Sequence, residues 1–228
     1  MLTLNGEPTS IFSRLFAKRN GEFVATPIKA YFPLAGRAAV TASLSPIAAT
    51  DAELVRAAQR GDRNAFGALY ERYGGMVHGI LLGRVPASAV EDLVQDVFLK
   101  AMPRMTSLRD PELFGGWLAA IARNRAADFF RQSNASPEQF EDTQQEQSRS
   151  TEASGIEKTE AEFVLAAIRQ LPETYRETLI LRLVEGMTGP EIALRTGLTH
   201  GSVRVNLHRG MQQLRQILES GMKQVAKR

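Results

Sequence analysis

The chain has 228 residues, of which 43% are hydrophobic and 23% charged, values that are ordinary for a globular protein of one or two small domains. It contains no cysteine, which excludes disulfide bonds, thiolate zinc sites and thiol catalysis. No apolar run approaches the roughly 20 residues that span a bilayer, so we expect no membrane insertion by this chain. The net charge of +3 is uneven: residues 132–160 are acidic, whereas residues 161–228 are basic, which suits a nucleic-acid partner.

Residues 1–50 differ in composition from the rest of the chain. They are rich in Ala, Pro, Ser and Thr, contain only two acidic residues, Glu7 and Glu22, and show no lasting helical or strand period. This composition predicts a disordered N-terminal extension, or a start codon assigned too far upstream. An organellar transit peptide has a similar acid-poor, Arg-bearing start and is the less favoured alternative.

Residues 51–131 predict a domain of four helices. Asp51 is placed to cap the first helix, and apolar residues then recur at three- and four-residue spacing along each segment. Short connections and the absence of a strand signal indicate an all-α domain. The third segment has the clearest apolar stripe, with acidic and amide side chains on its opposite face. That stripe comprises Val90, Leu93, Val94, Val97, Phe98 and Ala101.

Residues 132–160 are rich in Gln, Glu and Ser and nearly devoid of large apolar side chains. Burial of so little apolar surface cannot offset an ordering entropy of about 1–2 kcal/mol per residue. We therefore expect a flexible acidic linker between two small helical domains.

Residues 161–228 predict a second all-α domain that contains a helix-turn-helix. Ala193 is small where two crossing helices would touch, Gly197 stands at the turn, where a positive φ favours glycine, and Val203 returns the second helix onto the first. The second helix offers donors suited to phosphates and to base edges in a major groove. These are the side chains of His200, Ser202, Arg204, Asn206, His208 and Arg209.

Three segments follow one another in the chain: AVEDLVQDVFLKAMPRM at residues 89–105, FGGWLAAIARNRAADFFR at residues 114–131, and residues 171–215, which include the helix-turn-helix. In this order they resemble the polymerase-binding helix, the promoter-melting helix and the distal DNA-binding domain of bacterial RNA polymerase sigma factors. The resemblance is to the extracytoplasmic-function (ECF) class of the sigma-70 family. It extends over about residues 51–218 and leaves residues 1–50 without a counterpart.

The resemblance implies that residues 51–131 form sigma domain 2, which binds core polymerase and recognises and melts the downstream (−10) promoter element. Residues 161–228 would form sigma domain 4, which reads the upstream (−35) element. The polar face of the first motif would dock on a coiled coil of the clamp-bearing largest subunit. Without the resemblance, the spacing of these polar residues would favour an acidic face that is only solvated. The implied polymerase-binding residues are Asp92, Gln95, Asp96 and, at the edge of the face, Leu99.

The second motif would place polar side chains away from Trp117 and Ile121, which lie in register with the apolar core. Arginine supplies phosphate contacts, and Asn and Asp can read the edge of an unstacked base. Capture of single-stranded bases would offset the unstacking energy, so melting needs no cofactor. The residues implied at the −10 element are Arg123, Asn124, Arg125, Asp128 and Arg131.

At the −35 element the resemblance implies contacts from Arg204, His208 and Arg209, with His200 and Ser202 as weaker candidates. The sequence departs from the family pattern here. Val205 and Asn206 stand where a small polar residue and a basic residue are usual, so the bases that this helix reads are left open. Fewer cations predict fewer phosphate contacts and a weaker salt dependence of DNA binding.

No feature of the sequence indicates catalysis. The three histidines show no metal-ligand spacing, and there is no Walker loop, dinucleotide-binding fingerprint or nucleophile elbow. We expect a non-catalytic, cofactor-free cytoplasmic protein whose partners are core RNA polymerase, promoter DNA and, as the resemblance implies, an anti-sigma factor. The alternative is a free-standing helix-turn-helix regulator that binds duplex DNA as a dimer.

Overall fold

The structure, a computed structural model, describes residues 18–19, 22–23, 49–135 and 152–225, with side chains described over 49–132 and 160–220. Within these ranges the fold is all-α, as predicted; the only strands are the two-residue pair β1 (Lys18–Arg19) and β2 (Glu22–Phe23). Most of the expected N-terminal extension and residues 136–151 of the expected linker lie outside the described residues.

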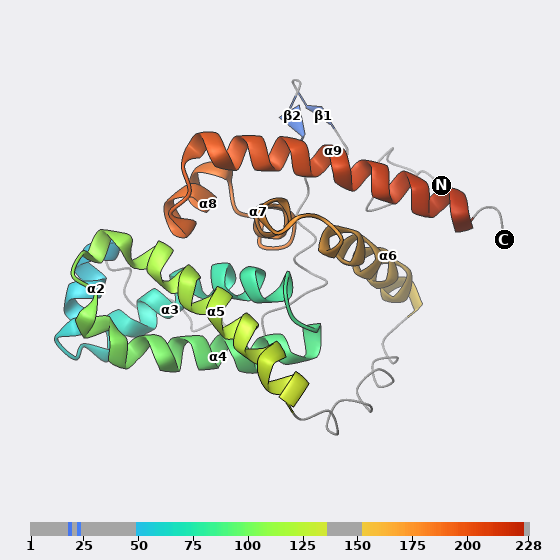
Figure 1. The fold of residues 1–228 in the computed structure, drawn as a ribbon. Helices are drawn as coiled ribbons and strands as arrows, with labels where there is room; N and C mark the ends of the chain where they lie inside the picture. The colour runs from blue at the N-terminus through green and yellow to red at the C-terminus, as the bar shows by residue number, and fades with distance from the viewer. Residues whose placement is uncertain (1–17, 20–21, 24–48, 136–151, 226–228) are drawn as a thin grey trace.

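The first helical unit consists of four helices and two short 3-10 turns (Figure 1). Their apolar faces meet in a core that includes the whole predicted stripe from Val90 to Ala101. The Phe114 ring is buried, and the half-buried Trp117 packs beside it with ring centroids 5.7 Å apart, in line with a core position. The elements are α2 (Asp51–Gln59), α3 (Arg63–Leu82), α4 (Ala87–Arg104), η2 (Met105–Ser107), η3 (Pro111–Leu113) and α5 (Phe114–Ala135).

The expectation that Asp51 caps α2 is wrong. Thr50 is the N-cap and forms a reciprocal capping box with Glu53. The Asp51 carboxylate instead accepts hydrogen bonds from Arg72 Nη1 at 2.7 Å and from the Tyr73 hydroxyl at 2.6 Å. Burial, together with this hydrogen bond to Asp51, raises the pKa of Tyr73. Asp51 therefore ties the start of α2 to α3.

The second unit begins earlier than expected. Its helices are α6 (Glu152–Arg169), α7 (Glu173–Leu183), α8 (Gly189–Thr196) and α9 (His200–Val225). The last residues of the expected linker, 152–160, are thus helical. The physical reason is that apolar residues in the C-terminal half of α6, such as Val164 and Ile168, are buried in the core. A helix nucleated by this packing extends into the polar sequence that precedes it.

The helix-turn-helix of α8 and α9 has the predicted geometry. Thr188 caps α8 in a second capping box with Glu191, and Gly197 ends the helix with φ of +74°. Ala193 and Val203 are both buried where α8 and α9 meet. This confirms the residue types that the sequence singled out for the crossing of these two helices.

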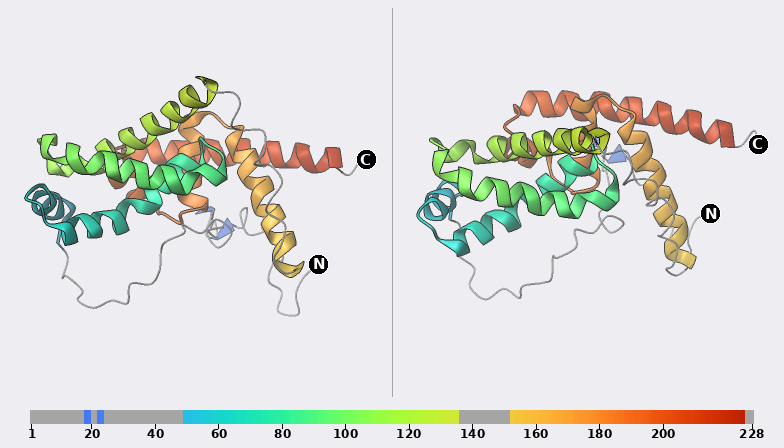
Figure 2. Two further views of the ribbon diagram at one scale, coloured as in Figure 1. Left: turned by 90° about the horizontal axis from the view of Figure 1, so that it is seen from below. Right: turned by 60° about the horizontal axis from the view of Figure 1, so that its bottom comes forward.

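The two units pack against each other and share one continuous core (Figures 1 and 2). α3 approaches α7 and the residues that follow it along three glycines four residues apart: Gly75, Gly79 and Gly83. A Cβ atom added at Gly79 would lie 2.9 Å from Leu181 Cδ2, which is too close for an unshifted neighbour. The glycines therefore permit a helix contact that any larger side chain would disturb.

A second backbone approach joins α5 to the turn of the helix-turn-helix. A Cβ atom added at Gly115 would collide with the Arg195 carbonyl oxygen, and one added at Gly197 would lie 3.4 Å from the Gly116 Cα. Arg195 also donates from Nη1 to the Arg72 carbonyl oxygen at 2.7 Å. The start of α5 and the turn between α8 and α9 are therefore in direct contact.

Candidate polymerase and DNA interfaces

The polar face of α4 is open to solvent. Asp92 and Gln95 are exposed and make no hydrogen bond or ion pair with another described residue, and Leu99 is 68% exposed. Asp96 differs, because it is only partly exposed and accepts two hydrogen bonds from Arg125. Three of the four residues implied for polymerase binding thus form a free surface with an apolar edge, while the fourth also holds α5.

The residues implied at the −10 element do not share one face of α5, which corrects the expected arrangement. Arg125 points to α4, where its Nε and Nη2 donate to Asp96 Oδ2 at 3.1 and 2.7 Å. Its side chain is only 12% exposed. Arg125 Nη1 is the one buried side-chain polar atom of the described residues that lacks a hydrogen-bond partner. The spacing of the apolar residues did not predict these orientations, because α5 packs against α4 on one side and contacts α7 on another.

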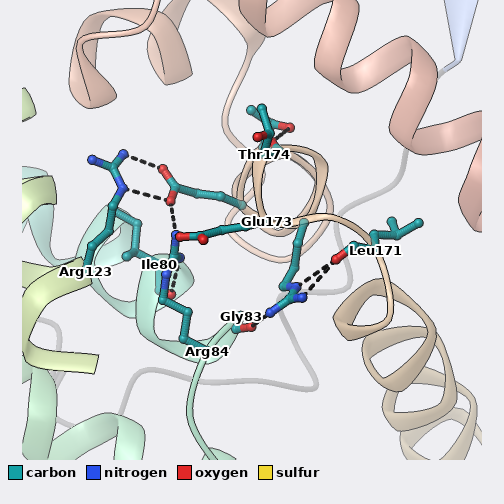
Figure 3. A network of polar contacts seen from close by, with 10 residues as sticks. Ile80, Gly83, Arg84, Arg123, Leu171, Glu173 and Thr174 are labelled. Atoms are coloured by element: carbon teal, nitrogen blue, oxygen red, sulfur yellow. Dashed lines mark hydrogen bonds and ion pairs between the residues drawn. The ribbon is translucent and has the colours of Figure 1, made fainter. Parts of the chain in front are cut away.

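Arg123 points toward α7, where one carboxylate binds it (Figure 3). Its Nε and Nη2 donate to the two carboxylate oxygens of Glu177 at 3.0 and 2.7 Å. Arg84, at the end of α3, donates to the same Glu177 at 2.7 Å and to the exposed Glu173 at 2.5 Å. Burial alone would raise the pKa of Glu177, but Arg123 and Arg84 together bring it below its ordinary value. Glu177 is therefore the charged centre of the contact between the units.

The remaining polar residues of α5 are more accessible. Asn124 is exposed and makes no hydrogen bond or ion pair with another described side chain. Arg131 forms an ion pair with Asp128 one helical turn earlier, and this hydrogen bond lowers the pKa of Asp128. Phe130, which precedes Arg131 in the chain, is 44% exposed. Asn124 is therefore the one member of the predicted −10 set that is both exposed and unpaired among the described residues.

The recognition helix α9 presents its cations to solvent. All five residues implied at the −35 element are exposed, and Arg204, His208 and Arg209 form no ion pair with described residues. Ser202 helps to start the helix: its amide donates to Thr199 Oγ1 at 3.1 Å, and the two hydroxyl oxygens are 2.8 Å apart. The five are His200, Ser202, Arg204, His208 and Arg209.

Asn206, expected among the exposed donors of this helix, is buried with only 7% of its surface accessible. It lies three residues after the buried Val203 and four before the buried Gly210, so helical spacing turns it to the core. Val205, 45% exposed, occupies the outward position instead. The two residues that depart from the family pattern therefore lie in different environments: Asn206 is buried, and Val205 faces solvent.

Sequence reasoning missed the polar contacts that join the two units. His78 is buried, with Nδ1 2.6 Å from Glu185 Oε1. Arg169 donates to the Leu82 and Val85 carbonyl oxygens near the end of α3, at distances of 2.8 to 3.1 Å. A cation there is favourable because it meets the negative end of the helix dipole. The spacing of Gly75, Gly79 and Gly83 was the one available signal in the sequence.

The described residues offer neither a metal site nor a membrane-spanning helix. No group of three or more His, Cys, Asp or Glu side chains is arranged to hold a metal ion. No helix in the described part of the chain is both long enough and apolar enough to cross a membrane.

Comparisons with known proteins match this geometry. The family model described as sigma-70 region 2 matches residues 69–136, and that described as sigma-70, region 4 matches residues 164–214. A relative from Streptomyces coelicolor, the ECF RNA polymerase sigma factor BldN, is 34% identical over 173 residues, which are 73% of this chain and 65% of that protein, a little under two thirds of its length.

The ECF RNA polymerase sigma-E factor of Haemophilus influenzae is 30% identical over 177 residues, covering 72% of this chain and 93% of that protein. Among solved structures, CnrH in complex with the cytosolic domain of CnrY is similar, with a TM-score of 0.52, 27% identity, and coverage of 75% of this chain and 97% of that one. Taken with the exposed α4 face and the helix-turn-helix, these matches show that the chain belongs to the sigma-70 family, as a member of the ECF class of RNA polymerase sigma factors, the subunits that direct transcription initiation at specific promoters.

Proposed function

We propose that residues 51–131 act as sigma domain 2 and residues 161–228 as sigma domain 4 of a non-catalytic, cytoplasmic specificity subunit. In this assignment the α4 face of Asp92, Gln95 and Leu99 docks on a coiled coil of the largest polymerase subunit. The observation that carries the proposal is that this face is polar, exposed and unpaired, with an exposed leucine at its edge. Carboxylate and amide groups at this spacing suit bidentate bonds from arginines on a partner helix.

The docking face is tested by Gln95→Arg, which places a cation where the partner would present its own. We expect at least a tenfold weaker affinity for core polymerase, because like charges then meet at the interface. Glu71→Arg, on the exposed side of α3, is the matched control and should bind normally. Asp96 is a poor test position because its carboxylate also holds Arg125. Normal binding by Gln95→Arg, measured by fluorescence anisotropy on purified core enzyme, would refute the assignment.

For α5 we propose the −10 element as the ligand, with Asn124 and Asp128 reading bases and the three arginines contacting phosphates. Arg123 can take this role only when it leaves Glu177, and Arg125 only when it leaves Asp96. The promoter elements lie about 25 base pairs apart, or roughly 85 Å at 3.4 Å per base pair. In the structure, by contrast, α5 touches the turn that precedes α9. Simultaneous reading of both elements therefore requires the two units to separate.

For α9 we propose the −35 element as the ligand, with its N-terminal turns in the major groove and Arg204, His208 and Arg209 in contact with the DNA. The similar protein CnrH forms a complex with the cytosolic domain of CnrY. By analogy we propose an anti-sigma partner for this chain. No feature of the described structure favours a free-standing dimeric regulator.

The −35 assignment can be tested apart from polymerase docking. Reconstituted holoenzyme should select discrete start sites from a genomic fragment library. Replacing Arg204 by Ala should weaken transcription from promoters that need an upstream element while leaving core binding intact. Equal transcription by both holoenzymes would argue against α9 as the reader.

A further inference from the structure

The outward face of α9 has an apolar centre. Val203, Asn206, Gly210 and Leu214 recur at three- and four-residue spacing and are buried against the rest of the second unit. On the opposite side, Gly201, Val205, His208 and Gln212 recur at a similar spacing and are exposed. The first two of these, in the N-terminal turns of the helix, are apolar.

Arg204 and Arg209 flank this outward line, one on each side of the helix. On an element lying in a major groove, flanking cations meet the phosphates of the two strands, while the centre faces base edges. Val205 therefore occupies the position from which bases are read, and the arginines occupy the positions from which the helix is held.

Neither Gly201 nor Val205 is explained by the stability of the helix. Glycine inside a helix costs roughly 0.5–1 kcal/mol relative to alanine, and β-branched valine also lowers helix propensity. A Cβ atom added at Gly201 would meet nothing within 4 Å, so no packing requires a glycine there. Val205 is 45% exposed, so more than a third of its apolar side chain faces solvent. Both residues are suited to a surface that another molecule approaches closely.

The major groove offers one apolar group at the base edges, the C5-methyl of thymine. We propose that Val205, with Gly201 permitting close approach, contacts the methyl group of a thymine in the upstream promoter element and so selects thymine at that position. The inference rests on the proposed function of α9 as the −35 reader and adds the base that its central side chain recognises.

The experiment removes one methyl group from the DNA and its partner from the protein. Reconstituted holoenzyme is first used to select its upstream element from a randomised library. Each thymine of that element is then replaced in turn by deoxyuridine, which lacks only the methyl, and binding is measured for wild-type and Val205→Ala holoenzymes. At one position deoxyuridine should weaken wild-type binding about fourfold, the loss expected for one buried methyl group. The Val205→Ala holoenzyme should bind both DNAs equally.

Arg204→Ala is the matched control, because it alters the same helix without touching the proposed methyl contact. It should weaken binding to the thymine and deoxyuridine promoters by the same factor. An equal deoxyuridine effect in wild type and Val205→Ala, or an element without a methyl-sensitive thymine, would overturn the inference. If Arg204→Ala and Val205→Ala both leave dependence on the upstream element unchanged, then the proposed function of α9 itself has failed.

Discussion

The two helices proposed to contact DNA, α5 and α9, carry similar polar residues in opposite electrostatic situations. On α5 each arginine of the predicted set is bonded to a carboxylate: Arg123 to Glu177, Arg125 to Asp96 and Arg131 to Asp128. On α9 the corresponding cations are exposed and form no ion pair within the described part of the chain. Their difference indicates that α9 is ready for duplex DNA, whereas α5 has still to release a carboxylate of α7.

The release of Arg123 is coupled to the contact between the two units. Glu177 lies on α7, and α7 packs on the glycines of α3. Arg84, which follows the end of α3, donates a hydrogen bond to Glu177 (Figure 3). Arg176 of α7 also donates to the Gly83 carbonyl oxygen at 3.3 Å. A movement of α7 away from α3 and α5 would break both ion pairs of Glu177, to Arg84 and to Arg123, together. Of the two helices proposed to contact DNA, α5 is thus held through Arg123 by α7, whereas the polar residues of α9 are accessible.

The largest effect on the contact between the two units is expected from Glu177→Gln. Removing one partner of a buried ion pair costs about 3–5 kcal/mol, and here the carboxylate serves two arginines. We expect the free chain to expand in small-angle X-ray scattering while helicity measured by circular dichroism is kept. Its affinity for a single-stranded downstream oligonucleotide should rise. Glu173→Gln is the matched control: this carboxylate is 66% exposed and bonds only Arg84, so little should change. An unchanged radius of gyration for Glu177→Gln would contradict the role of Glu177.

A second substitution disturbs the packing between α3 and α7 without changing any charge. Gly79→Leu places a side chain where even a Cβ atom meets Leu181 and Glu185. Overpacking of this kind costs about 1–3 kcal/mol, and separation of α3 from α7 would relieve it. We expect the same expansion as for Glu177→Gln. Gly67→Leu, on the same helix with nothing within 4 Å of its added Cβ, should leave scattering unchanged. Equal behaviour of the two variants would show that the glycine contact does not hold the units together.

The accessible helix can be tested in the converse direction. Arg204→Ala and Arg209→Ala should each weaken holoenzyme binding to an upstream duplex several-fold. Each should also reduce the salt slope of log affinity by about 0.9, because one phosphate contact is lost. Neither should alter scattering by the free chain. A salt slope identical to that of the wild type would place these arginines away from the phosphates.

The smallest effect is expected from the dependence of folding stability on pH. The pKa of Glu177 in the folded chain lies below the ordinary value of 4.5, so the unfolded state binds more protons in acid. The stability contributed by Glu177 is complete above about pH 4.5 and is lost as the pH falls through the lower folded value. Urea-unfolding midpoints of the wild type should therefore fall more steeply below pH 4.5 than those of Glu177→Gln. Parallel pH curves would show that this carboxylate contributes no such linkage.

Local pattern was sufficient for much of the fold. The apolar stripe of α4 and the small residue, glycine and valine of the helix-turn-helix all lie where the spacing predicted them, because each reflects contacts between neighbouring helices. Prediction was poorer where long-range contacts decide. Asp51 proved to bind Arg72 and Tyr73 instead of capping its helix, and Arg125 proved to face α4.

The sequence by itself determined the helical class, the motif order, and the exposed set on α9 apart from Asn206, because helical periodicity depends on nearest neighbours along the chain. Only the tertiary structure decided which arginines are free, since a cation is paired or unpaired according to carboxylates from distant segments. Glu177 lies 54 positions from Arg123 and 93 from Arg84, and no periodicity connects them. The close contact along the glycines of α3 was not predicted, and only the packing of α7 against them shows it.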